Sequence, residues 1–311
     1  MLKINLKSGK ICMVNFMQKK DILKKYLAHN GSVRVIVLDA TKMVTEARKL
    51  HRLSNVATAA LGRTLAISTI MSSMFKDKSY RLTVQIKGDG PLGNIIVCGD
   101  SSLNMKGYVT NPDVELPLNS KGKLDVAKAV GKGTLNVIKD IGLKDPYIGN
   151  SELISSEIAE DFAYYFAGSE QTPSVVFLGV NIGKDNNVQK ACGYIIQPLP
   201  DCEENIIDLI ENINIYISSV TSLMTDIENI DDVAKTITGD NDIEFLEEEY
   251  PIYKCDCSKT RIEKTIIALG KSEALDIVGN NDGILELTCN FCNKSYRYDK
   301  EQIEKIFEKK T

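Results

Sequence analysis

Four cysteines near the C-terminus have the residue type and the spacing of a metal site. Cys255 and Cys257 form a Cys-x-Cys pair, and after 31 further residues Cys289 and Cys292 form a Cys-x-x-Cys pair. Thiolates are soft ligands, and four of them suit the tetrahedral coordination that Zn²⁺ prefers. Neither of the two histidines of the chain lies near these cysteines. We therefore predict one Zn²⁺ per chain, held by four sulfur atoms.

Each cysteine pair can supply two ligands from a short stretch of chain. Side chains alternate along an extended chain, so Cys255 and Cys257 would leave it on the same face. Cys289 and Cys292 suit a tight turn that directs both sulfurs at one ion. The 31 residues between the pairs are enough for a strand, a helix and a return strand. The alternative, four unrelated buried thiols, would require a coincidence of spacing.

Length and composition indicate a soluble globular protein. The chain has 311 residues, enough for two domains, with 43% hydrophobic and 26% charged residues. Its N-terminus lacks the apolar core of a signal peptide. The longest apolar region, residues 56–75, is interrupted by Arg63 and by several Ser and Thr, so we expect no membrane span. We expect a cytoplasmic protein, in which paired thiols start out reduced and favour a metal over a disulfide.

The charges are unevenly distributed along the chain. Residues 201–250 carry a net charge of −14, whereas residues 1–200 carry about +9 and residues 251–311 carry +1. An acidic block between two neutral or basic segments indicates a separate module. The overall pI near 5.5 argues against a general nucleic-acid-binding protein, which would present a basic face.

The pattern of hydrophobic residues predicts an α+β fold followed by a helical linker and a small metal-binding domain. The predicted domains are a possible N-terminal extension (1–16), an α+β core domain (17–200), an acidic helical linker (201–250) and a zinc-binding domain (251–311). Expected strands of the core cover residues 33–39, 80–87, 94–99, 105–110, 134–139, 175–180 and 193–200, and expected helices cover 41–53, 55–74, 124–130 and 152–166.

The acidic linker has an amphipathic helical pattern. Its apolar residues recur at alternating intervals of four and three, which places them on one helix face: Ile206, Ile210, Ile213, Ile217, Val220 and Met224. We expect a second helix from about Ile230 to Ile237 and a last acidic helix over residues 242–249. Because the apolar face requires burial while the like charges repel, these helices should be stable only while docked. Two interpretations remain open, an ordinary helical linker and an element that opens and exposes its apolar face.

These features together resemble the heat shock protein 33 family, the redox-regulated 33 kDa chaperonins. The resemblance covers about residues 19–307, and its most specific part is the pattern of the four cysteines. Further matching stretches are His51-Arg52-Leu53-Ser54, 57–63, 88–93, Tyr165-Phe166, 169–174 and Gln197-Pro198-Leu199-Pro200. Residues 1–16 depart from the family pattern.

The resemblance implies an ATP-independent holdase chaperone rather than an enzyme. It implies that the reduced, zinc-bound form is inactive. Under oxidative stress, the thiols would become the disulfides Cys255–Cys257 and Cys289–Cys292, and the zinc would be lost. The zinc-binding domain would then unfold, the linker would open, and the exposed apolar surface would bind unfolding client proteins. The implied partners are these clients and, in the oxidised form, a second copy of the chain. From the hydropathy and charge patterns above we expect no membrane partner and disfavour nucleic acid.

Two other functions would use the same cysteines. A zinc ribbon in a nucleic-acid-binding or translation protein should carry basic and aromatic residues around the metal, and the cluster of Lys294, Tyr296, Arg297 and Tyr298 keeps this alternative open. A thiol-disulfide enzyme would use the Cys-x-x-Cys pair alone and would leave the Cys-x-Cys pair unexplained. The expected role of Cys98, Cys192 and Cys202 is packing, and Cys12 has no assigned role.

Overall fold

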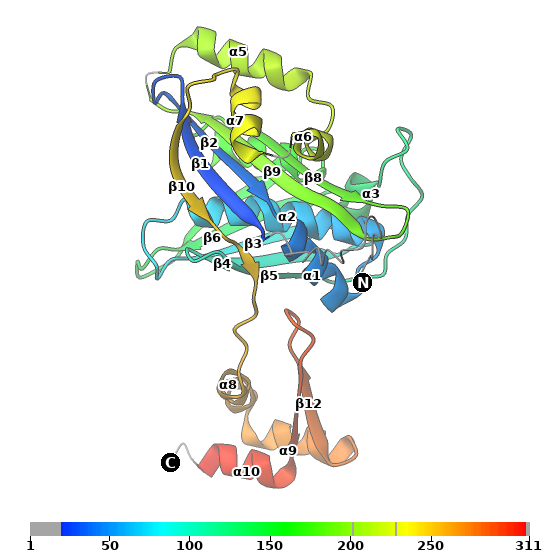
Figure 1. Ribbon diagram of the computed structural model, residues 1–311. Helices are drawn as coiled ribbons and strands as arrows, with labels where there is room; N and C mark the ends of the chain where they lie inside the picture. The colour runs from blue at the N-terminus through cyan, green and yellow to red at the C-terminus, as the bar shows by residue number, and fades with distance from the viewer. Residues whose placement is uncertain (1–19, 201, 228, 309–311) are drawn as a thin grey trace, which may run out of the picture.

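The computed structural model describes residues 20–200, 202–227 and 229–308. The predicted N-terminal extension and Cys12 lie outside these residues. The described chain has an α+β fold, as the sequence predicted, with two large, mainly antiparallel sheets and a small C-terminal body below them (Figure 1). Within the described ranges, no helix is long and apolar enough to cross a membrane.

The chain before the C-terminal body contains eleven strands and seven helices, counted over the described residues. The strands are β1 (Ile22–Ala28), β2 (Val33–Asp39), β3 (Arg81–Gly88), β4 (Asn94–Asp100), β5 (Asn104–Val109), β6 (Gly133–Asp140), β7 (Tyr147–Glu152), β8 (Val175–Ile182), β9 (Val188–Pro198), β10 (Glu244–Glu249) and β11 (Ile252–Tyr253). The helices are α1 (Thr41–His51), α2 (Asn55–Ser73), α3 (Val126–Val130), α4 (Ala159–Gly168), α5 (Glu204–Ile215), α6 (Val220–Asp226) and α7 (Ile230–Thr238).

Helix α2 lies between the two sheets and forms the centre of the core (Figure 1). One sheet has the order β10-β1-β2-β9-β8 and the other the order β11-β5-β4-β3-β6-β7. The many small residues of α2 allow close approach of its neighbours: a Cβ added at Gly62 would lie 2.7 Å from a methyl of Val180 in β8 and 2.9 Å from one of Val44 in α1. Ser54 caps the helix by accepting a hydrogen bond from the backbone N–H of Ala57, as the sequence predicted.

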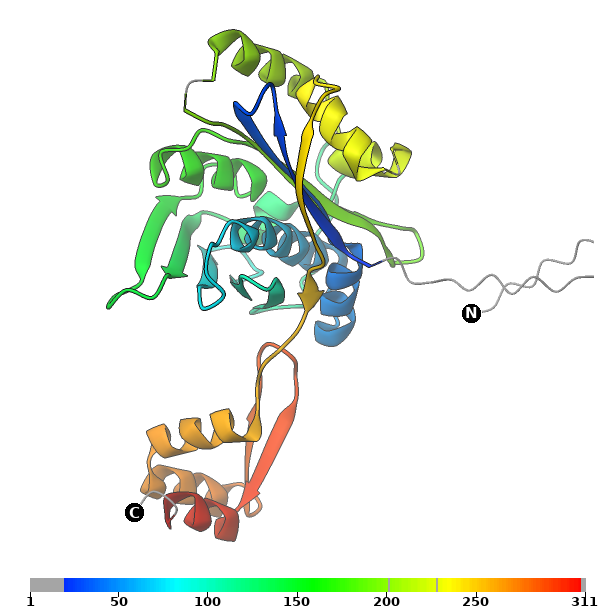
Figure 2. The same cartoon turned by 60° about the vertical axis from the view of Figure 1, so that its left-hand side comes forward.

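The linker helices cover the outer face of the five-stranded sheet (Figures 1 and 2). Ile210, Val220 and Met224 are buried there against residues of β2 and β9. The predicted first helix is in fact two helices, because the chain breaks between Ile215 and Val220. The break occurs at consecutive serines, and the Ser219 hydroxyl caps α6 by accepting from the backbone N–H of Ser222.

The predicted acidic helix over residues 242–249 is wrong. This segment is the edge strand β10, which pairs antiparallel with β1. The sequence pattern could not show this outcome, because it depends on the lysines of β1 that face the glutamates of β10. Strand β1 itself was not predicted.

Strand β7 was also not predicted, and the expected helix over residues 152–166 begins only at Ala159. The Asp161 carboxylate accepts hydrogen bonds from the backbone N–H groups of Ile154, Ser155 and Ile158, at 2.8–2.9 Å. These bonds hold the preceding residues in a loop. Ile154, which the sequence placed on the apolar face of the helix, is 57% exposed.

The C-terminal body, defined here as the C-terminal module (residues 254–308), has its own small core. It contains α8 (Lys259–Leu269), α9 (Lys271–Asn280), β12 (Ile284–Thr288), β13 (Ser295–Asp299) and α10 (Lys300–Glu308). Its buried residues include Ile266, Leu285 and Ile303, and they form a cluster separate from the two clusters of the core. Both views show the module joined to the core by the chain that leaves β10 (Figures 1 and 2).

Candidate metal centre

The fold brings the four predicted cysteines together. All four sulfur atoms lie within 4.8 Å of one another. The Sγ atoms of Cys255 and Cys289 are 3.7 Å apart, and those of Cys257 and Cys292 are 3.3 Å apart. A tetrahedral Zn²⁺ site with Zn–S bonds of about 2.3 Å requires sulfur–sulfur separations of about 3.8 Å. The four side chains are half-buried, so the donor set and its spacing fit a tetrahedral metal ion.

The two cysteine pairs come from two separate segments of the module. Cys255 and Cys257 lie on the irregular chain between β11 and α8. Cys289 and Cys292 lie in the turn between β12 and β13, where the backbone N–H of Cys292 donates to the Cys289 carbonyl at 3.3 Å. The backbone N–H of Asn293, whose φ of 54° is left-handed, donates to the same carbonyl at 2.8 Å. The predicted tight turn is therefore present.

The segment between the pairs differs from the predicted strand, helix and return strand. It contains the two helices α8 and α9 and then β12, while the return strand β13 follows the second pair. Two helices and a hairpin give the module enough apolar side chains for its own core.

The surroundings of the sulfurs favour different protonation states. Burial raises the pKa of Cys255 and also the pKa of Cys292. Burial likewise opposes ionisation of Cys257. There, however, hydrogen bonds from the Tyr296 hydroxyl, at 3.3 Å, and from neighbouring thiols outweigh burial and lower the pKa to about 7. Binding of a metal to this cluster must therefore release protons.

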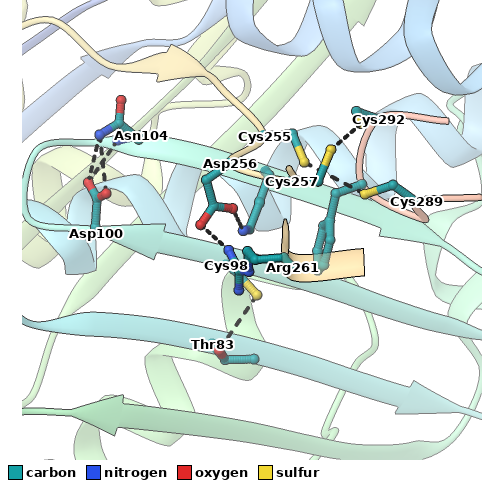
Figure 3. A network of polar contacts seen from close by, with 12 residues as sticks. Thr83, Cys98, Asp100, Asn104, Cys255, Asp256, Cys257, Arg261, Cys289 and Cys292 are labelled. Atoms are coloured by element: carbon teal, nitrogen blue, oxygen red, sulfur yellow. Dashed lines mark hydrogen bonds and ion pairs between the residues drawn. The ribbon is translucent and has the colours of Figure 1, made fainter. Parts of the chain in front are cut away.

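The residues between the paired cysteines contact the core domain. Asp256, the middle residue of Cys-x-Cys, forms ion pairs with Lys106 of β5 and with Arg261 of α8 (Figure 3). Phe291, inside Cys-x-x-Cys, packs edge-to-face on Tyr108 of β5 with ring centroids 5.2 Å apart, and the Lys106 ammonium lies 5.0 Å from its ring centre. The sequence segments that hold the sulfurs therefore also attach the module to the core.

Tyr253 of β11 forms a second part of this attachment. Its hydroxyl lies 2.7 Å from the Gly107 carbonyl of the core and 2.8 Å from the Phe291 carbonyl of the module, and its one hydrogen can be donated to either. The His51 ring nitrogen Nε2 is 2.9 Å from the same hydroxyl, and burial lowers the pKa of His51. The Asn293 amide donates to the Leu50 carbonyl at 2.8 Å.

Sequence reasoning missed these attaching residues. Metal binding does not require an acidic residue or a phenylalanine between the cysteines. The presence of Asp256 and Phe291 at these positions was therefore the only signal in the sequence for a second, attaching role. We use the name docking contact for the interface of Asp256, Phe291 and Asn293 with the core, including the Tyr253 hydroxyl.

The basic and aromatic cluster of the zinc-ribbon alternative does not form an aromatic surface. Tyr296 and Tyr298 are 9% and 2% exposed and belong to the core of the module. The hydroxyl of Tyr296 instead faces Cys257. Arg297 forms an ion pair with Glu286 across the hairpin, at 3.0 Å.

The other described cysteines lie apart from the metal centre. Cys192 is buried under α6, and burial raises its pKa to about 12. Cys98 is half-buried on β4 beside the Thr83 hydroxyl, and burial raises its pKa also. Cys202 is half-buried near the start of α5. Burial of Cys192 agrees with the expected packing role.

Comparison with known proteins gives one consistent result. A family model described as "Hsp33 protein" matches residues 21–299. The 33 kDa chaperonin of Acetivibrio thermocellus is 43% identical over 287 residues, which cover 92% of this chain and 97% of that protein. The 33 kDa chaperonin of Clostridium perfringens is 42% identical over 292 residues, which cover 93% and 92%. The crystal structure of the 33 kDa chaperonin (heat shock protein 33 homolog) from Thermotoga maritima matches with a TM-score of 0.86 and 35% identity over 94% of this chain and 98% of that one.

Proposed function

The chain belongs to the Hsp33 family, and from this premise we propose that its chaperone function is an ATP-independent holdase activity under redox control. In this proposal the reduced, zinc-bound form is inactive and the oxidised, disulfide-bonded form binds unfolding proteins. The protein acts in the cytoplasm, has no enzymatic activity, and forms a homodimer when oxidised.

The observation that carries this proposal is the position of the four-sulfur cluster beside the docking contact. Zn²⁺, when bound, holds the four sulfurs together, and structural zinc sites contribute on the order of 10 kcal/mol to the folding of small modules. The C-terminal module has only a small core of its own. Without the metal it has too little buried apolar surface to replace a contribution of that size.

Oxidation removes the thiolates that hold the metal. Formation of each disulfide takes two electrons from a pair of cysteine sulfurs, and a peroxide oxidant accepts them and is reduced to water. The family resemblance assigns the disulfides to Cys255–Cys257 and Cys289–Cys292. The short sulfur–sulfur distances of the cluster, 3.7 and 3.3 Å, instead join the two pairs crosswise. Disulfides within each pair therefore separate the two halves of the cluster.

The docking contact transmits this change to the core domain. Asp256 and Phe291 lie inside the two pairs, so a disulfide in either pair moves a residue that contacts Lys106 or Tyr108. Loss of these contacts removes the C-terminal anchor of β11 and β10. The linker helices are joined to that anchor through β10, and their release uncovers the apolar face that they bury against the five-stranded sheet, which includes Ile210 and Val233. That surface, together with the sheet beneath it, would bind clients.

An aggregation assay tests this proposal. Zinc-loaded reduced protein, protein oxidised with peroxide at raised temperature, and oxidised protein reduced again with a dithiol are each mixed with a thermally unfolding client. We expect only the oxidised sample to suppress light scattering, and the activity should return to the basal level after reduction. Zinc release without any suppression of aggregation would refute the holdase function.

A further inference from the structure

Strand β10 is attached to the molecule mainly through one neighbour. Its residues pair with β1 from Leu23 to Leu27, with a bulge between Lys25 and Tyr26. Phe245 and Leu246 of β10 are 54% and 46% exposed. Because the strand buries so little apolar surface, its backbone hydrogen bonds and its charges must supply most of its attachment.

The charges of β1 and β10 are complementary. Lys25 forms ion pairs with Glu247 and Glu249, at 2.9 and 2.8 Å. Lys24 pairs with Glu248 at 3.4 Å and, more closely, with Asp231 of α7 at 2.9 Å. Both lysine side chains are largely shielded from water, with 16% of Lys24 and 15% of Lys25 exposed. Charges shielded from water in this way interact more strongly than exposed surface pairs.

An aromatic contact adds to the match. The ring of Phe245 packs edge-to-face on Tyr26, with centroids 6.0 Å apart, and lies 5.7 Å from the Lys24 ammonium. The edge of β1 therefore presents backbone hydrogen-bonding groups, two lysines and an aromatic side chain to whichever segment lies along it. These are the elements of recognition by strand addition, in which backbone bonds give affinity and side chains give selectivity.

We infer that the edge of β1 is a binding site for extended client segments that carry acidic and aromatic residues, and that β10 occupies this site in the reduced protein. This inference rests on the proposed function, since it requires release of the linker on oxidation. Release of α7 and β10 together would leave Lys24 and Lys25 without their acidic partners, and an open sheet edge accepts an extended peptide readily. The occupant is a client segment, selected by the same charges that select β10.

A peptide with the sequence of residues 241–250 (NDIEFLEEEY) tests the site directly. We expect the fluorescently labelled peptide to bind the oxidised protein and to bind the zinc-loaded protein at least about tenfold more weakly, because β10 then fills the site. Reversal of both lysines, Lys24→Glu with Lys25→Glu, should weaken binding by about tenfold or more, since three ion pairs become repulsive. The matched control, Lys121→Glu with Lys123→Glu in an exposed loop, should bind as the unaltered protein does.

A charge-exchanged peptide guards against a variant that fails to fold. Replacement of the four glutamates of the peptide by lysines should abolish binding to the unaltered oxidised protein and restore binding to the charge-reversed double variant. Hydrogen exchange should also slow at the backbone amides of residues 23–27 when the peptide binds. Equal binding to all variants, or no protection of these amides, would overturn the inference.

Competition with a client separates this inference from the proposed function. The peptide should lower the suppression of aggregation by the oxidised protein. If the oxidised protein suppresses aggregation fully with the peptide in excess, the site is wrong and the holdase function stands. If it never suppresses aggregation, the proposed function itself fails. At high protein concentration, β10 of a second copy could block the site. If the peptide therefore binds only at low protein concentration, the occupant is β10 of a second copy, and the assignment to clients is overturned.

Discussion

The hydroxyl of Tyr253 offers a direct test of the docking contact, because this one atom contacts both the core and the C-terminal module. Tyr253→Phe removes this atom and keeps the ring. The hydroxyl lies 2.7 Å from the Gly107 carbonyl, 2.8 Å from the Phe291 carbonyl and 2.9 Å from the His51 ring. Its removal leaves these groups without that partner at a half-buried site.

The expected cost follows from this geometry. A buried polar group that loses its partner costs about 1–3 kcal/mol. Entry of water could recover part of this cost, so the lower half of the range is the working value. A cost of that size changes the ratio of docked to undocked module by about five- to thirtyfold. The reduced protein should then undock more often without any change to the four sulfurs.

The assay follows zinc release and hydrogen exchange in parallel. With a limiting amount of peroxide, the Tyr253→Phe variant should release zinc faster than the unaltered protein, and amides of β11 should exchange faster even before oxidation. The matched control is Tyr250→Phe, in which the same atom is removed from a tyrosine that is 52% exposed and bonds to the Glu248 side chain. Equal rates for the two variants would refute the coupling of the docking contact to the metal centre.

Three further predictions concern the metal, the pH and the linker. Cys255→Ser should abolish tight binding of zinc and unfold the C-terminal module, because the module loses metal-linked folding free energy on the order of 10 kcal/mol. The control variant Cys202→Ser should keep one zinc per chain. One tightly bound zinc in Cys255→Ser would contradict the four-sulfur site. Burial holds the pKa of His51 below its ordinary value of 6.5. The docked form binds fewer protons than the undocked form, so docking should weaken as the pH falls from about 6.5 towards the lowered pKa. Exchange of β11 amides should show this dependence, and His51→Gln should flatten it; an equal slope in both proteins would exclude His51 as its source. Gly239 has φ of 69°, and a Cβ added there would lie 2.6 Å from Cδ1 of Ile213. Gly239→Ala should therefore destabilise the linker helices by about 1–2 kcal/mol and lower the temperature at which peroxide activates the protein. An unchanged activation temperature would show that this packing does not limit activation.

The sequence allowed prediction of the features that depend on local pattern. The spacing of the four cysteines, the capping by Ser54 and the β-branched enrichment of β2 each depend on residues close together in the chain. The linker seam at Ile210, Val220 and Met224 also proved to be a buried face.

The features that depend on distant partners could not be predicted in the same way. Residues 244–249 have no strand pattern of their own, and β10 forms because Lys24 and Lys25 lie on the adjacent strand. The helix before Ala159 is replaced by a loop because Asp161 binds several backbone N–H groups at once. The docking contact joins residues of β5 and α1 to the turn that contains Phe291, far away in the chain, and no local pattern reports such a contact.

Hydrogen exchange of the linker, measured in the zinc-loaded reduced protein and in the oxidised zinc-free protein, tests the central claim most directly. The account predicts that amides of α7, β10 and β11 exchange much faster after oxidation, while those of β2 and β9 remain protected. Unchanged protection of α7, β10 and β11 in fully oxidised protein that has lost its zinc would contradict it, because the metal centre would then exert no control over the acidic linker.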